Sequence, residues 1–118
     1  MIKRLLSYIL PVKIYEKHSE ISQSLEVTWN NGKLVLDSKN TNYSYGSLQK
    51  VLRKGLVAIG FEKICEMQDI LVLGVAGGSV IKTLVNDVKY KNNITGVEID
   101  KAVMELSNVY FGLNQIEN

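Results

Sequence analysis

The stretch from Asp69 to Asp100 constrains the fold more than any other part of this sequence. It begins with a continuous apolar run, Ile70–Leu73, which is typical of a strand buried on both faces of a parallel sheet. A glycine-rich turn follows, and then apolar residues recur at helical spacing, at positions 80, 81, 84, 85 and 88. Ile94–Ile99 is predicted to be a second short strand. This order over about 30 residues predicts a βαβ unit.

The glycine turn and the acid after the second strand predict a nucleoside-binding site. The turn carries little side chain, so a ligand can approach its backbone closely, and the following helix directs free N–H groups to the same place. Glu98 lies 24 residues after Gly74. An acid at that place can accept hydrogen bonds from ribose hydroxyls. The alternative interpretation is a βαβ unit whose glycines serve packing alone.

The glycine pattern also bears on the type of nucleoside. A dinucleotide site prefers the pattern G-x-G-x-x-G. Here Ala76 stands at the second glycine and Ser79 at the third. The pattern therefore argues against a dehydrogenase-type NAD domain. This class of protein is kept as a less favoured alternative.

The segments VLGVAGGSVIKTLVND and GVEIDKAVMELSNVYF resemble the nucleotide-binding half of spermidine synthases and of related class I S-adenosylmethionine-dependent methyltransferases. Val72 fits the synthases, because typical methyltransferases carry an acid two residues before the first glycine. The resemblance implies S-adenosylmethionine or decarboxylated S-adenosylmethionine as cofactor. The turn would hold the amino-acid or aminopropyl end of the cofactor, Glu98 the ribose and Ile99 the adenine. The implied cofactor-binding residues are Gly74, Val75, Ala76, Gly77, Gly78, Glu98 and Ile99.

Two departures from the synthase pattern bear on the reaction. Gly77 stands where those synthases often have an aspartate. Leu36-Asp37 resembles the end of the synthase strand that leads to the active site, but the glutamine, acids and Tyr-His pair of the family are missing from residues 38–46. We therefore expect methyl transfer, with aminopropyl transfer or a non-catalytic nucleoside-binding or interaction module as alternatives. No catalytic residue is predicted in this chain.

The residues before the βαβ unit predict a short helix, an antiparallel β unit and a longer helix. Strands over 12–37 fold back at Asn31-Gly32, the strongest short hairpin signal. A helix is predicted over Gly46–Phe61, capped by Ser44 or Ser47, with Gly60 suited to its end. An amphipathic N-terminal helix is predicted to end before Pro11 and to face a core or a partner with Leu5, Leu6, Ile9 and Leu10.

Two further features complete the expected secondary structure. Cys65, in the link before the buried strand, is predicted to be a small buried hydrophobe. The last helix is predicted over Lys101–Leu113, and its packing face consists of Val103, Leu106, Val109 and Tyr110.

These elements together predict an α/β fold. It consists of an N-terminal β-hairpin unit followed by the first half of a Rossmann-type, class I methyltransferase-like parallel sheet, which is incomplete. Residues 1–45 form the first predicted domain, and residues 46–118 form a partial Rossmann-type nucleoside-binding domain. The resemblance covers roughly residues 12–113, the first half of a full-length relative. The catalytic half is therefore expected to be absent from this chain.

Composition excludes several other classes of protein. The net charge is +2, and the 14 basic residues are spread along the chain, so no nucleic acid partner is expected. The single cysteine rules out an internal disulfide and suits a reducing cytoplasm, and one cysteine with one histidine argues against a Cys/His metal site. No apolar run approaches the roughly 20 residues that span a membrane. The open edge of the strand at Ile70–Leu73 predicts a homodimer or larger homo-oligomer.

Overall fold

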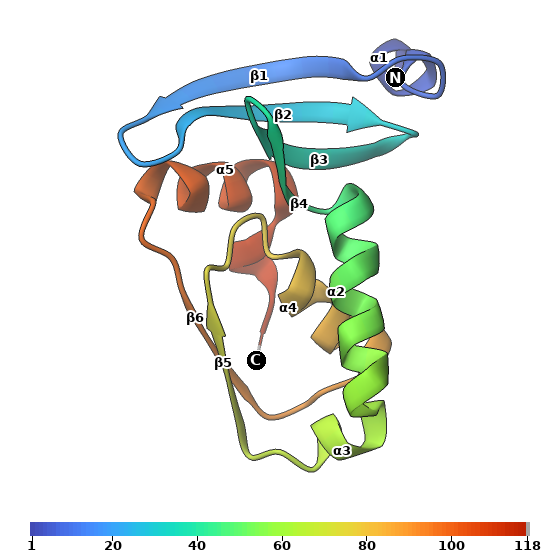
Figure 1. The fold of residues 1–118 in the computed structure, drawn as a ribbon, viewed down its shortest axis with the longest axis vertical. Coiled ribbons are helices and arrows are strands. Elements are labelled where there is room, and N and C mark those ends of the chain that lie inside the picture. Colours follow the sequence, from blue (N-terminus) through green and yellow to red (C-terminus); the bar gives the residue numbers. More distant parts are fainter. Residues whose placement is uncertain (118) are drawn as a thin grey trace.

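The computed structural model describes residues 1–117 and has a mixed α/β fold, as predicted (Figure 1). Residue 118, the last of the second predicted domain, lies outside the described part. A four-stranded antiparallel sheet has the order β1-β2-β3-β4, and a two-stranded parallel sheet consists of β5 and β6. The strands are β1 (Val12–Ser19), β2 (Gln23–Asn30), β3 (Lys33–Ser38), β4 (Thr41–Ser44), β5 (Asp69–Leu73) and β6 (Asn93–Val97).

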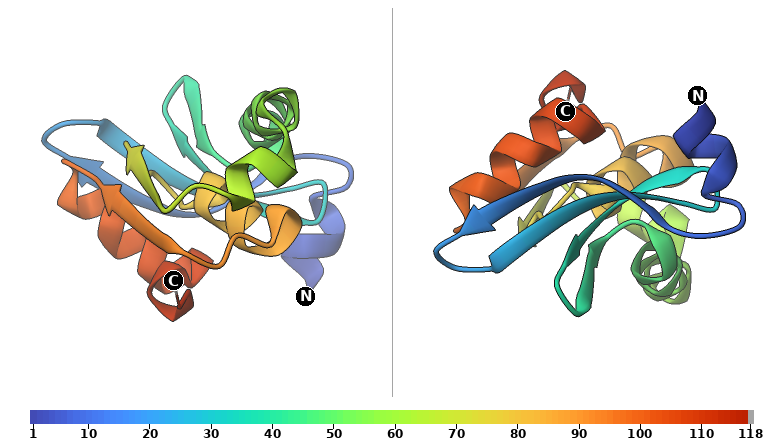
Figure 2. Two further views of the ribbon diagram at one scale, coloured as in Figure 1. Left: turned by 90° about the horizontal axis from the view of Figure 1, so that it is seen from below. Right: turned by 90° about the horizontal axis from the view of Figure 1, so that it is seen from above.

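The helices lie beside and between these two sheets (Figures 1 and 2). Helix α5 lies against one face of the antiparallel sheet, and α2 runs from the end of β4 toward α3, at the start of β5. The α-helices are α1 (Ile2–Leu6), α2 (Gly46–Ile59), α3 (Phe61–Cys65), α4 (Ser79–Thr83) and α5 (Lys101–Phe111). A π-helical turn η1 (Leu84–Val88) continues α4, and a 3-10 turn η2 (Leu113–Gln115) follows α5.

The hairpin predicted at Asn31-Gly32 is confirmed. Both residues have positive φ, 48° for Asn31 and 73° for Gly32, and they join a register that pairs Asn30 with Lys33. A two-residue loop with positive φ at both positions matches the right-handed twist of the strands. Val27 of β2 and Leu36 of β3 pair with each other and are both fully buried, and the next pair, Thr28 with Val35, is buried as well.

Two hydrophobic clusters hold the molecule together. The first joins the antiparallel sheet to α5, where Val103, Leu106 and Phe111 pack against buried residues of β2 and β3. The ring of Phe111 stacks on Tyr45 with the centroids 4.7 Å apart. The second cluster lies under the parallel sheet, and its buried residues are Ile64, Leu84, Val88 and Tyr90.

The structure corrects the expected burial of β5. The strand is not buried on both faces: Ile70 and Val72 pack on the second cluster, whereas Leu71 is 61% exposed and Leu73 is 76% exposed. In the described residues β5 pairs with β6 only, and helices cover one face of this pair. Cys65 is also exposed rather than buried, because α3 turns it outward while the neighbouring Ile64 fills the cluster.

Several helix details also differ from the sequence prediction. The apolar side chains of α1 and of the turn after it are exposed, so they do not face a core within residues 1–117. Helix α2 has no buried residue, and Val109 of α5 is exposed. Neither Ser44 nor Ser47 caps α2; Asn42 Oδ1 instead accepts a hydrogen bond from the Leu48 N–H at 3.1 Å. Gly60 does end α2, with φ of 100°.

Candidate functional site

Parallel pairing of β5 with β6 brings the glycine turn and Glu98 together. Leu73 pairs with Val97, and the Gly74 N–H donates to the Val97 carbonyl at 2.8 Å. The chain therefore leaves both strands at the same edge of the sheet. In parallel α/β sheets, ligands bind outside this carboxyl edge.

Two backbone N–H groups fix the Glu98 carboxylate at this edge. Ala76 N–H donates to Glu98 Oε2 at 2.9 Å, and Asp100 N–H donates to Oε1 at 3.0 Å. A carboxylate has about four lone-pair sites, so these two bonds leave further sites for hydroxyl donors. Glu98 is half-buried and so remains accessible to a ligand.

One part of the predicted site is open. Gly74 has φ of 80°, and no atom lies within 4 Å of the position that a Cβ would take there. Ile99 follows Glu98 and is 79% exposed. Ala76 has φ of 49°, a left-handed conformation uncommon for a residue other than glycine. Gly74, Glu98 and Ile99 therefore lie at the edge that a ligand can reach, and the half-buried Ala76 lies beside them through its bond to Glu98.

The other part of the glycine turn is closed. A Cβ on Gly77 would lie 2.8 Å from the Ser44 Cβ, and a Cβ on Gly78 would lie 2.6 Å from Leu113 Cδ1. Val75 is buried against Gly96 of β6, where a Cβ would lie 2.6 Å from Val75 Cγ2. Val75, Gly77 and Gly78 therefore form the frame of the turn rather than its accessible surface.

Residues that the sequence analysis missed hold this frame. The Tyr45 hydroxyl donates to the Gly77 carbonyl at 2.7 Å, and the Ser44 hydroxyl lies 3.0 Å from that of Ser79. Ser107 of α5 donates to the Ala76 carbonyl at 2.6 Å. Burial raises the pKa of Tyr45, so its hydroxyl stays protonated and can keep donating. None of these residues has a sequence pattern that indicates its role. Gly96, which contacts Val75, does have one, because a glycine inside a strand often marks a close approach of another group.

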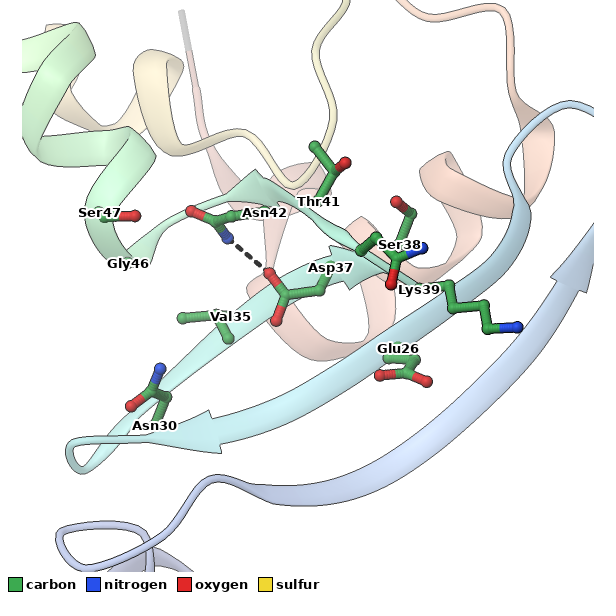
Figure 3. A pocket seen from close by; sticks show the side chains of 11 residues that line it. Glu26, Asn30, Val35, Asp37, Ser38, Lys39, Thr41, Asn42, Gly46 and Ser47 are labelled. Atoms are coloured by element: carbon green, nitrogen blue, oxygen red, sulfur yellow. Dashed lines mark hydrogen bonds between the residues drawn. The ribbon is translucent and has the colours of Figure 1, made fainter.

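Asp37 lies in a different cavity from the glycine turn. This cavity has a volume of about 300 Å³, and none of residues 74–78 lines it (Figure 3). Asn42 Nδ2 donates to Asp37 Oδ1 at 2.7 Å, and Glu26 lies directly opposite on β2. Burial raises the pKa of Asp37 against the effect of this hydrogen bond, and the charge of Glu26 adds to the rise. The structure therefore does not bring Asp37 to the predicted cofactor site.

Asp100 is next to Glu98 but is fully engaged. It is 4% exposed, and its Oδ1 accepts from Ala102 N–H at 3.0 Å as the cap of α5. Its Oδ2 accepts from the hydroxyls of Ser19 and Ser22. Burial acts to raise the pKa of Asp100, but these hydrogen bonds outweigh burial and lower it. Asp100 is therefore a charged structural group.

Neither the described residues nor comparisons with known proteins indicate a further type of site. Among residues 1–117, no group of three or more His, Cys, Asp and Glu side chains could hold a metal ion, and no helix is long and apolar enough to cross a membrane. No protein-family model matches the sequence, and no curated protein matches it.

Proposed function

We propose that this chain is the cofactor-binding portion of a spermidine synthase-like methyltransferase, a protein that transfers a group from an adenosyl sulfonium cofactor. The observation that carries the proposal is the Glu98 carboxylate, held by Ala76 N–H and Asp100 N–H at the carboxyl edge of β5 and β6. In this proposal β5, α4 and β6 are the start of a Rossmann-type sheet. Glu98 accepts hydrogen bonds from the ribose hydroxyls, and the exposed Ile99 packs on the adenine.

The space around Gly77 favours methyl transfer over aminopropyl transfer. In the resembling synthases an aspartate often stands at this position. Here Ser44 and Tyr45 occupy the space that any side chain at position 77 would need. S-adenosylmethionine is therefore the proposed cofactor, and its decarboxylated form belongs to the alternative, a fragment of a polyamine synthase.

The open edge of β5 supports self-association as part of the proposal. A cavity of about 380 Å³ lies between this strand and α2, and its lining is mostly apolar. Leu71 and Leu73 add exposed apolar surface on the other face of the strand. An unpaired apolar strand edge is a template for pairing with another chain. We propose a homodimer or larger homo-oligomer, and a cytoplasmic location that suits the single cysteine.

Calorimetric titration with S-adenosylmethionine tests the proposed function through Glu98→Gln. A hydrogen bond to a charged group contributes about 1.5–3 kcal/mol, and 1.4 kcal/mol corresponds to about tenfold in affinity. We expect Glu98→Gln to weaken binding by about ten- to a hundredfold. Glu66→Gln, at the end of α3 and the opposite end of β5, is the matched control and should bind like the natural chain.

Three results would contradict the proposed function. Unchanged affinity in Glu98→Gln would remove Glu98 from the site. Tighter binding of NAD than of S-adenosylmethionine would support the dehydrogenase-type alternative instead. Binding of neither compound would leave the interaction module as the better account. Circular dichroism of each variant checks that the fold is retained.

A further inference from the structure

A buried carboxylate joins the antiparallel sheet to the loop that carries Glu98. Asp100 Oδ2 lies 2.5 Å from Ser19 Oγ and 2.6 Å from Ser22 Oγ, both in or next to the turn between β1 and β2. Ser19 is itself 4% exposed, and its Oγ accepts from the N–H groups of Ile21 and Ser22. Residues about 80 positions apart in the chain therefore meet at one carboxylate.

The two serine contacts are separate from the helix cap. Capping of α5 uses Asp100 Oδ1 and Ala102 N–H, whereas the serines use Oδ2. A buried charge is costly unless hydrogen bonds compensate it, so the serine hydroxyls stabilise the charged form of Asp100 where it lies. A second contact joins the same elements, since Lys17 of β1 pairs with Glu105 of α5.

The position of Asp100 is transmitted to the glycine turn through Glu98. Asp100 N–H donates to Glu98 Oε1, and Glu98 Oε2 accepts from Ala76 N–H. A continuous path of hydrogen bonds thus runs from the β1–β2 turn through Asp100 and Glu98 to Ala76. Side chains held by such bonded neighbours keep the geometry that ligand binding needs.

We propose that Ser19, Ser22 and Asp100 are positioning residues that set the orientation of the Glu98 carboxylate from the antiparallel sheet. This role rests on the proposed function for its consequence in cofactor binding. None of the three residues needs to touch the ligand. The antiparallel sheet then contributes to the nucleoside site through this path rather than through direct contact.

Ser22→Ala provides the test, because Ser22 is only half-buried and its removal leaves the core intact. Amide hydrogen exchange of Ala76 reports the bond to Glu98 independently of any ligand. We expect exchange at Ala76 to become about tenfold faster in Ser22→Ala, because the variant loses the hydrogen bond from Ser22 to the charged Asp100. The affinity for S-adenosylmethionine should fall by a similar factor. Ser22→Thr keeps the hydroxyl and should restore both.

The control is Ser24→Ala, which removes a hydroxyl of β2 that bonds to Glu16 instead. It should leave exchange at Ala76 unchanged. A general loss of stability would accelerate exchange at the core residue Val27 as much as at Ala76, and that result would overturn the positioning role. Unchanged exchange at Ala76 in Ser22→Ala would overturn it as well. Faster exchange at Ala76 in a chain that binds no S-adenosylmethionine would support the path and contradict the proposed function.

Discussion

Gly77 is a position in the glycine turn where an added side chain would meet the packed residues Ser44 and Tyr45. A Cβ there would lie 2.8 Å from the Ser44 Cβ and 3.0 Å from Tyr45 Cε2. Inserting a methyl group into such a packed site costs about 1–3 kcal/mol. We expect Gly77→Ala to lower the free energy of unfolding by that amount in chemical denaturation.

Gly55→Ala is the matched control for Gly77→Ala. Gly55 lies inside α2, and no atom comes within 4 Å of its Cβ position. A glycine-to-alanine change at such a place raises stability by about 0.4–1 kcal/mol. Equal destabilisation by the two changes would contradict the packing described around Gly77.

Single residues could be predicted where the signal is local. Asn31-Gly32 requires positive φ, and its turn is as expected. Ser44 and Tyr45 gave no such signal, because they act on Gly77 and Ser79 only after β4 has folded against the turn. The roles of Ser19 and Ser22 were hidden for the same reason, since their partner Asp100 is distant in sequence.

At the scale of elements, the pairing of β2 with β3 places two acids opposite each other. Glu26 faces Asp37, and like charges directly opposite on a sheet destabilise it by about 0.2–1 kcal/mol. Asp37→Asn removes one charge, and the amide oxygen can still accept from Asn42. We expect the variant to be more stable than the natural chain at pH 7.

The stabilisation expected from Asp37→Asn should depend on pH. The folded state raises the pKa of Asp37, so the native chain binds the proton more tightly than the unfolded chain. The penalty of the charged form therefore vanishes as the pH falls below the unfolded pKa of about 3.9. Urea denaturation at pH 7 and pH 3 should show a gain for Asp37→Asn only at pH 7. A gain of equal size at both values would contradict the charge explanation.

Elements with a strong local pattern were predicted well, and their surroundings were not. The βαβ order and the helix at 101–111 follow from periodicity alone. Strand β4 was missed because Thr41–Ser44 is short and polar, and it forms by pairing with β3. The exposure of Leu71 and Leu73 was missed because an apolar run does not specify how many layers cover a strand.

At the scale of the whole molecule, the open edge of β5 predicts self-association. We expect the natural chain to sediment as an oligomer. Leu71→Lys places a charge on this strand, and this variant should sediment as a monomer in sedimentation velocity. Val51→Lys is the control, because Val51 is similarly exposed but lies on α2. A natural chain that is monomeric at high concentration would contradict the prediction.

The packing of α5 against the antiparallel sheet also belongs to this scale. The sequence predicted an apolar face on this helix, and Val103 and Leu106 are buried as expected. It did not predict that this face would pack on β2 and β3, because periodicity indicates a face but not its partner. The division into residues 1–45 and 46–118 stays a prediction.

Amide chemical shifts during titration with S-adenosylmethionine test the central claim most directly. The proposed site predicts the largest shifts at the exposed edge, at Gly74, Ala76, Glu98 and Ile99. The amides around Asp37, in the separate cavity of Figure 3, should remain unchanged. Saturating shifts centred on Asp37, or no shifts at millimolar cofactor, would contradict an adenosyl cofactor site at the glycine turn.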